Sequence, residues 1–413
     1  MNNFIKKNIN SIIAIFILMG PVIDLITGIS LHIFKMNLTI GIILRVIFML
    51  FIMYTTLFVY KKKKALIPYL IIGIYMVLYT VGIIIYKDYG LFRELQGLIK
   101  VFYFPIILIS LYMFKDEIKI TNKTLFITLF LYLIFIFIPL TFGVGFDSYQ
   151  ITKEGTLGFY NSANEISGII SILTPIMFIV LMESKVIQRI IFIGIYLVVI
   201  LMMGTKTPLL TLLITVLASI IYFGNKSLKE KNFKKIIITS FILLIGTCGL
   251  LLIIPKTNFY KNIETHLDYL ELDNVTEVFE DEELIDHFIF SQRLTFLHRK
   301  ARLYDKSSIY QKLFGLGYLK DTKKTKMIEM DYFDIFYSHG IIGFIVFFGV
   351  VGYVLVNILR KREKLTLNRY MLLLSVLLIV FLSFFTGHIL IAPAVSILVV
   401  AIILKLNYKE KAK

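Results

Sequence analysis

Residues 329–356 read EMDYFDIFYSHGIIGFIVFFGVVGYVLV, and this stretch decides the class of fold. Its second half is an uninterrupted apolar run of the kind that crosses a bilayer as a helix. Its first half carries three carboxylates and a histidine, namely Glu329, Asp331, Asp334 and His339. Charge at the mouth of a membrane helix is costly, and it usually faces a bundle interior or a wet cavity. The stretch therefore predicts a membrane-spanning helix with a polar site at its entrance.

The composition of the whole chain is that of a polytopic membrane protein. Of 413 residues, 58% are hydrophobic and only 17% are charged, and the mean hydropathy of +0.83 is far above that of soluble domains. The single cysteine, Cys248, lies in an apolar run, so no disulfide can form within the chain. The formal net charge of +17 does not indicate nucleic-acid binding, because the lysines fall in short loops between apolar runs, where they set membrane topology.

Apolar runs of about 17–25 residues predict about twelve transmembrane helices in an all-α protein. They are expected at 9–30, 38–60, 65–86, 98–114, 124–142, 166–182, 189–204, 208–223, 236–254, 335–357, 370–387 and 388–406. Connections rich in lysine and arginine, such as Lys61 to Lys64 and RKREKLTLNR at 360–369, fall on one side. The positive-inside rule places that side, and both termini, in the cytoplasm.

One outside segment, 255–334, is much longer than the others and is polar. We expect a division into an N-terminal bundle at 1–254, a large extracytoplasmic loop at 255–334 and C-terminal membrane helices at 335–413. The first half of the loop is acidic and the second half basic. Both 262–288 and 291–314 have helical patterns, and Gly315 and Gly317 are expected to end the second.

The carboxylates at 329–334 are candidate catalytic residues. In a helix beginning near Glu329, the residues Glu329, Tyr332, Phe336 and His339 share one face, and Asp331, Asp334 and Ser338 share another. The alternative is that they cap the helix and interact with its dipole. Capping accounts for one or two carboxylates but not for three and a histidine.

Cations that could bind an anionic ligand occur in two places. Arg293, Arg299 and Arg302 lie on the predicted helix of the loop, and guanidinium groups suit phosphate oxygens; pairing with the acidic half of the loop is the alternative. Lys206 lies in the short outside turn MGTKTPLL at 203–210, against the positive-inside bias. That position favours phosphate binding over snorkelling to the interface.

Other outside segments carry weaker signals. GFYNSANEISG at 158–168 opens a span with Asn161, Asn164 and Glu165, which could bind a sugar; an N-terminal cap by Ser162 or Asn161 is the alternative. The amphipathic segment LFRELQGLIK at 91–100 is expected to lie on the membrane interface. His388 receives no site role. No nucleotide loop, zinc motif or dinucleotide fingerprint is found, so nothing supports ATP hydrolysis or zinc chemistry.

The order of these features resembles the O-antigen ligase and O-antigen polymerase superfamily. The resemblance rests on the ANE motif at 163–165, the glycine-threonine-basic turn at 204–206, GLGY at 315–318 and GIIG at 340–343. It implies a C-type glycosyltransferase fold acting on lipid-linked oligosaccharides outside the bacterial cytoplasmic membrane. Two positions depart from the family pattern: Glu329 and Met330 stand where a His-Asn pair is common, and Lys206 replaces an arginine. The catalytic position by alignment is Glu329, and His339 does not match it.

On this resemblance, we expect a polymerase of polyprenyl-pyrophosphate-linked repeat units for a capsule, exopolysaccharide or O-antigen. Our hypothesis for its mechanism is direct attack that inverts the anomeric centre and needs no metal. Glu329, or Asp331 as the second choice, would be the general base, and Asp334 is the third candidate catalytic residue. The pyrophosphate would be bound by Lys206, Arg293, Arg299 and Arg302. Asn161, Asn164, Glu165, Tyr318 and His339 would bind glycan or acceptor. No cofactor is expected, and a chain-length regulator and a flippase are candidate partners. A ligase acting on a wall polymer or other acceptor, and a lipid-linked glycan transporter, stay open as alternatives.

Overall fold

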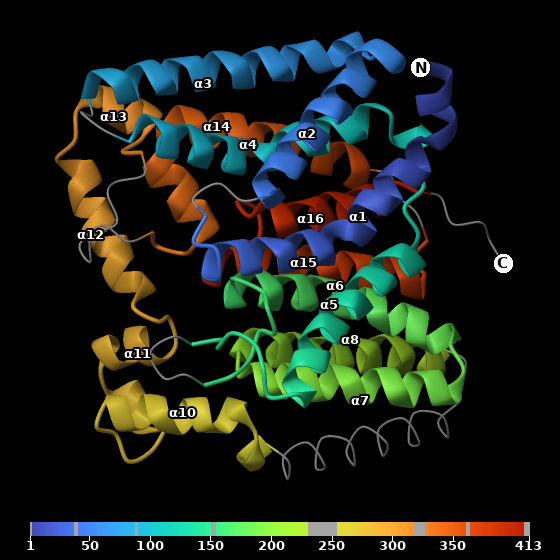
Figure 1. Cartoon of the computed structure of the whole chain (residues 1–413), viewed down its shortest axis with the longest axis vertical. Coiled ribbons are helices and arrows are strands. Elements are labelled where there is room, and N and C mark those ends of the chain that lie inside the picture. The colour runs from blue at the N-terminus through green and yellow to red at the C-terminus, as the bar shows by residue number, and fades with distance from the viewer. Residues whose placement is uncertain are drawn as a thin grey trace.

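A computed structural model describes residues 2–36, 40–86, 90–149, 154–229, 254–317, 327–360 and 364–408. Within these residues, ten helices are long and apolar enough to cross a membrane, and they lie side by side in one bundle (Figure 1). They are α1 (Asn2–His32), α2 (Ile40–Tyr54, continued by a π-helical turn Thr55–Val59), α3 (Leu66–Tyr86), α4 (Leu91–Met113), α5 (Asn122–Thr141), α6 (Ala163–Glu183), α7 (Val186–Met203), α8 (Lys206–Lys229), α14 (Asp331–Leu359) and α15 (Leu367–Phe385). The described residues form no sheet, only an isolated bridge between Asp147 and Thr156. The predicted all-α membrane class is confirmed.

The prediction of twelve spans is confirmed only in part. The predicted span 236–254 falls almost wholly outside the described residues. The predicted span 388–406 is wrong in extent, because 386–392 are not helical and α16 (Pro393–Lys405) has 13 residues. Such a helix is about 20 Å long, shorter than a hydrocarbon core of about 30 Å. α16 is buried along its length against α4, α6 and α15, and buried surroundings allow non-helical backbone at membrane depth.

Two long helices, α4 and α6, form the centre of the bundle together with α16. α4 packs on α2, α3, α14 and α16, while α6 packs on α5, α8 and α15. Outer helices such as α3 and α7 instead expose isoleucine and leucine side chains, among them Ile67 and Ile187. Exposed apolar side chains on membrane-length helices indicate contact with lipid.

Four short helices, α10 (Asn258–Tyr269), α11 (Glu282–Phe288), α12 (Arg293–Asp305) and α13 (Ile309–Phe314), lie between α8 and α14 in sequence. Figure 1 shows them at one end of the bundle, opposite the N-terminus. The helical patterns predicted in both halves of the loop are confirmed. Asp286, 4% exposed, accepts hydrogen bonds from the N–H groups of Leu294 at 2.9 Å and Thr295 at 2.8 Å. This acidic residue therefore caps α12 by accepting hydrogen bonds from N–H groups of its first turn, which have no acceptor within the helix.

A kink in α14 joins the two glycine motifs. Gly340 has φ +67° and ψ −175°, so the helix is broken there. The break frees the carbonyl groups of Tyr337 and Ser338, which accept hydrogen bonds from Leu316 N–H at 2.9 Å and Gly317 N–H at 3.0 Å. A Cβ added at Gly340 would lie 2.5 Å from a backbone nitrogen of the opposing turn. Only glycine permits this conformation and approach.

Additional short turns of 3-10 helix occur at Lys63–Ala65, Lys115–Glu117, Ile254–Lys256 and Glu277–Glu280.

Candidate active site

The two aspartates at the start of α14 hold the surrounding backbone in place. Asp331, 0% exposed, accepts hydrogen bonds from three successive N–H groups, those of His388 at 2.7 Å, Ile389 at 2.9 Å and Leu390 at 2.7 Å. Asp334, 2% exposed, accepts from three others, at residues 328–330, between 2.8 and 3.2 Å. Each carboxylate thereby satisfies backbone donors that would otherwise be buried without partners. Asp331 fixes the segment before α16, and Asp334 fixes the chain entering α14.

Lys300 fastens α12 to this helix start. It is 7% exposed, its Nζ lies 3.4 Å from Asp334 Oδ1, and it donates to Ser338 Oγ at 3.0 Å. A buried lysine is tolerated only with such partners. The contact holds the middle of α12 against the first two turns of α14.

Glu329 differs from the two aspartates in both its backbone and its partners. It precedes α14 and has φ +64°, so the predicted face shared with Tyr332, Phe336 and His339 is wrong. Its Oε2 accepts hydrogen bonds from Asn164 Nδ2 at 3.1 Å and from Arg293 Nη2 at 3.3 Å. The Glu329 side chain is 23% exposed. Residues from α6, α12 and the α14 entrance thus meet at one partly exposed carboxylate.

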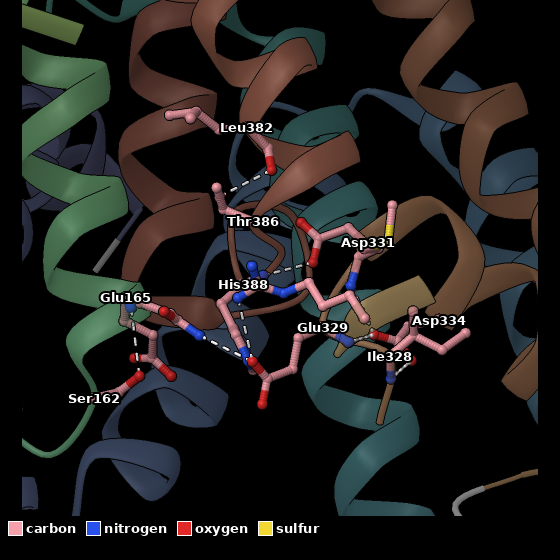
Figure 2. A network of polar contacts seen from close by, with 12 residues as sticks. Ser162, Glu165, Ile328, Glu329, Asp331, Asp334, Leu382, Thr386 and His388 are labelled. Carbon is pink, nitrogen blue, oxygen red and sulfur yellow. Dashed lines mark hydrogen bonds and ion pairs between the residues drawn. The ribbon is translucent and has the colours of Figure 1, made fainter. Parts of the chain in front are cut away.

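Figure 2 shows Glu329 in one polar network with Asp331, Asp334, His388 and Glu165. The left-handed backbone of Glu329 is a strained conformation for a residue with a side chain, and such conformations persist where the surrounding structure enforces them. The bonds that Asp334 makes to the 328–330 backbone supply this constraint.

A cavity of about 380 Å³ opens beside this network, between α1, α2, α4 and α6 and the segment 388–394. Its lining includes the charged residues Asp24, Arg45, Arg93, Lys100 and Glu165, together with His388 and Tyr160. Its volume falls within the range of about 300–1,000 Å³ that is usual for small-molecule sites. The cavity and Glu329 together form the candidate active site.

Of the four cations predicted to bind pyrophosphate, only Arg293 contacts a predicted catalytic residue. Lys206 donates to the carbonyl oxygen of Phe288 at 2.8 Å, and its ammonium lies 4.1 Å from the centre of the Phe288 ring. Arg299 and Arg302 are exposed on α12 and do not line the cavity. Their predicted role in binding pyrophosphate stays a prediction.

The five residues predicted to bind glycan or acceptor are distributed over different surroundings. Asn161 and Glu165 line the cavity, and Asn164 binds Glu329. His339 is fully buried and its Nδ1 lies 3.2 Å from Tyr75 Oη, away from the cavity lining. Tyr318 lies outside the described residues.

Sequence reasoning missed several cavity residues. The segment 91–100 was expected on the interface, but it forms the first turns of α4, and Glu94 is 2% exposed and accepts a hydrogen bond from Tyr79 Oη at 2.7 Å. Lys100, in the same segment, lines the cavity, as do Arg45 and His388. The signal that could have found Arg45 and Lys100 is charge inside or beside apolar runs, which marks functional sites in membrane proteins.

Two comparisons with known proteins gave different results. No curated protein matches the chain. The family model described as "O-antigen ligase like membrane protein" matches residues 6–283 and 273–408. Members of this family are membrane ligases and polymerases that transfer glycosyl groups. Because the match spans nearly the whole sequence, the chain belongs to the O-antigen ligase-like membrane protein family.

Proposed function

We propose that this protein joins polyprenyl-pyrophosphate-linked oligosaccharide repeat units into a capsule, exopolysaccharide or O-antigen type of polysaccharide. Membership of the family supports glycosyl transfer from a lipid-linked donor. The observation that carries the proposal is the Glu329 carboxylate, held by Asn164 and Arg293 in the same polar network as the cavity residue His388 (Figure 2).

The reaction takes place at the outer face of the cytoplasmic membrane in this proposal. The lysines at 61–64 lie between α2 and α3, at one end of the bundle. The entrance of α14 lies towards the other end of α3, since α13 packs on α14 and its Tyr310 ring lies beside Gly82 of α3. The positive-inside rule assigns the lysine-rich end to the cytoplasm, which supports an outward-facing site.

Glu329 suits the role of general base better than either aspartate. Each aspartate is buried, and backbone N–H groups occupy both of its carboxylate oxygens, so neither aspartate has an oxygen free to take a proton from an acceptor hydroxyl. Glu329 is instead held by side chains, which can rearrange when substrate binds, and it retains exposed surface. Asp331 and Asp334 then act by positioning the backbone around Glu329.

The proposed step is a single displacement. Glu329 accepts the proton of an acceptor hydroxyl as the hydroxyl oxygen bonds to the anomeric carbon of the donor. The bond from that carbon to the pyrophosphate oxygen breaks, its electron pair leaves with the polyprenyl pyrophosphate, and the anomeric configuration inverts. Arg293 has a buried Nε with no hydrogen-bond partner among the described residues, so this N–H can stabilise charge on the leaving group. The scheme calls for no cofactor.

A ligase is the second candidate, and the description of the matching family favours it. A ligase would use the same donor and the same step but would transfer the glycan once, to a wall polymer or another acceptor. The chemistry at Glu329 does not differ between the two.

Purified protein in detergent, incubated with a labelled polyprenyl-pyrophosphate repeat unit and no nucleotide, separates these functions. A ladder of glycans that grows by one repeat unit supports the polymerase. Product that appears only as a single transfer to an added acceptor indicates the ligase. If no glycan product forms and the protein moves the lipid-linked unit across the membrane of proteoliposomes, the polymerase and the ligase are both contradicted and a transporter is indicated.

A further inference from the structure

We infer that the cavity between α1, α2, α4 and α6 binds an oxyanion, a phosphate or carboxylate group of the substrate, with Lys100, Arg45 and Tyr160 as its donors. The identity of the substrate rests on the proposed function. The anion site itself rests on the three donors, none of which was among the residues predicted from the sequence.

The cavity reaches below the surface of the bundle. Lys100 lies nine residues after Leu91, the first residue of α4, which corresponds to about 14 Å along the helix. Such a position brings an ammonium group within the membrane-spanning part of the bundle, where an ionised side chain requires a partner or water.

The Lys100 ammonium is unpaired among the described residues. No hydrogen bond or ion pair joins its ammonium to another residue in the part of the chain that the structure describes. Glu165 attracts it electrostatically, whereas Arg45 and Arg93 repel it. Cations gathered around one cavity repel one another unless an anion lies between them. An oxyanion in the cavity would relieve this repulsion and give Lys100 a hydrogen-bond partner.

Arg45 is held rigidly at the cavity wall. It is 8% exposed and forms an ion pair with Asp24 through one guanidinium nitrogen, and Asp24 accepts a second hydrogen bond from Tyr132 Oη at 2.5 Å. The charge of Asp24 is thus compensated by Arg45 and Tyr132. Guanidinium carries five donors in a fixed planar geometry, so one pairing leaves others for a ligand in the cavity.

Tyr160 provides an independent observation. The residue lines the cavity and is 1% exposed. Its ring packs on Tyr132 with centroids 5.4 Å apart. Its hydroxyl is buried and has no hydrogen-bond partner within the described residues. Buried hydroxyls are normally paired, and an exception calls for an explanation such as a water molecule or an ion at the site. A ligand oxygen in the cavity would provide the missing partner.

The two carboxylates of the lining do not fully compensate the positive charge of the cavity. The cations Arg45, Arg93 and Lys100 outnumber the carboxylates Asp24 and Glu165 by three to two. Glu165, at the start of α6, repels an anion and suits neighbouring sugar hydroxyls as a hydrogen-bond acceptor. We therefore place the oxyanion towards Lys100 and Arg45, and a sugar towards Glu165.

The test uses the full-length protein in detergent and two probes, undecaprenyl diphosphate and a tetrasaccharide that contains hexuronic acid. Uncharged undecaprenol serves as the reference ligand. We expect Tyr160→Phe and Lys100→Met each to weaken binding of one probe by roughly tenfold or more, since each removes a hydrogen bond to a charged group. Binding of undecaprenol should not change.

A matched control separates binding from folding. Tyr196 is as buried as Tyr160, but its hydroxyl lies 2.8 Å from Thr174 Oγ1 and it does not line the cavity. Tyr196→Phe should leave binding unchanged and lower the thermal midpoint. Tyr160→Phe should not lower the midpoint of the free protein, because its hydroxyl makes no hydrogen bond there.

Each outcome decides the inference. Weaker binding of undecaprenyl diphosphate assigns the site to the carrier lipid, and weaker binding of the tetrasaccharide assigns it to the glycan. The inference is overturned if each probe binds the two variants as tightly as it binds wild type. It is also overturned if wild type binds neither probe. Polymerisation with an unchanged KM in Lys100→Met refutes the site but not the function. If undecaprenyl diphosphate binding depends on Lys100 but no glycan product forms, the anion site is supported and the proposed function is refuted.

Discussion

The three backbone hydrogen bonds accepted by Asp331 make a quantitative prediction for the Asp331→Asn variant. Oδ1 accepts from His388 N–H, and Oδ2 accepts from the N–H groups of Ile389 and Leu390. Asparagine keeps one acceptor oxygen and places an NH2 group where the other was. At best two neutral hydrogen bonds survive, and one buried N–H then faces another donor.

The cost follows from the usual strengths of these bonds. Hydrogen bonds to charged groups contribute about 1.5–3 kcal/mol each, and neutral ones about 0.5–1.5 kcal/mol. Losing one charged bond and weakening two others therefore destabilises the protein by roughly 3–5 kcal/mol, a large effect for a single substitution. The segment before α16 should loosen, and activity should fall together with stability.

Thermal unfolding in detergent, followed by circular dichroism because the chain has no tryptophan, measures this effect. We expect the midpoint of Asp331→Asn to fall by several degrees. Asp268→Asn is the matched control, since Asp268 is exposed on α10, and it should change stability by about 0.5 kcal/mol at most. An Asp331→Asn protein with the wild-type midpoint but no activity would refute the positioning role and make Asp331 a candidate base.

Two further predictions concern the kink and the loop. Gly340→Ala should unfold at a much lower temperature than wild type, because its Cβ would lie 2.5 Å from backbone at φ +67°, whereas Gly349→Ala on the same helix meets no atom within 4 Å and should be tolerated. Burial, with Lys206 and then His287 adding to it, lowers the pKa of His266. The unfolded state therefore takes up the proton first, so stability should fall as the pH drops below about 6.5 and level off below the lowered folded-state pKa. In His266→Gln, thermal midpoints measured between pH 7.5 and 5 should lack this part of the pH dependence; an unchanged profile would contradict it.

Local patterns were enough to predict the membrane class and to place Glu329 at the entrance of a membrane-spanning helix. Hydropathy depends on consecutive residues, so spans such as 166–182 and the helices of the loop could be located from sequence. The GLGY and GIIG motifs indicated the family, and the structure brings residues 315–317 of the first motif to the kink at Gly340.

The partners of the carboxylates could not be predicted in the same way. Glu329, Asp331 and Asp334 look alike in sequence, and only the tertiary fold brings the N–H groups of 388–390 to Asp331. The same return of the chain places His388 at the cavity. Long-range contacts of this kind leave no local periodicity.

The prediction of a full span at 388–406 failed for a related reason. The residues before Pro393 are apolar and continue the hydropathic run, so they resemble the start of a helix. Their N–H groups are instead used by Asp331, and the helix begins at the proline. Hydropathy reports burial, but it does not tell a buried helix from a buried irregular segment.

The most direct test of the central claim is glycan synthesis by purified Glu329→Gln, alongside wild type, with the labelled lipid-linked repeat unit. Glutamine has nearly the same shape and keeps an oxygen that can accept from Asn164 and Arg293, but it cannot take up the proton of an acceptor hydroxyl. We predict a wild-type thermal midpoint and no glycan product. A product formed by Glu329→Gln at the wild-type rate would contradict it and move the proton transfer to another residue.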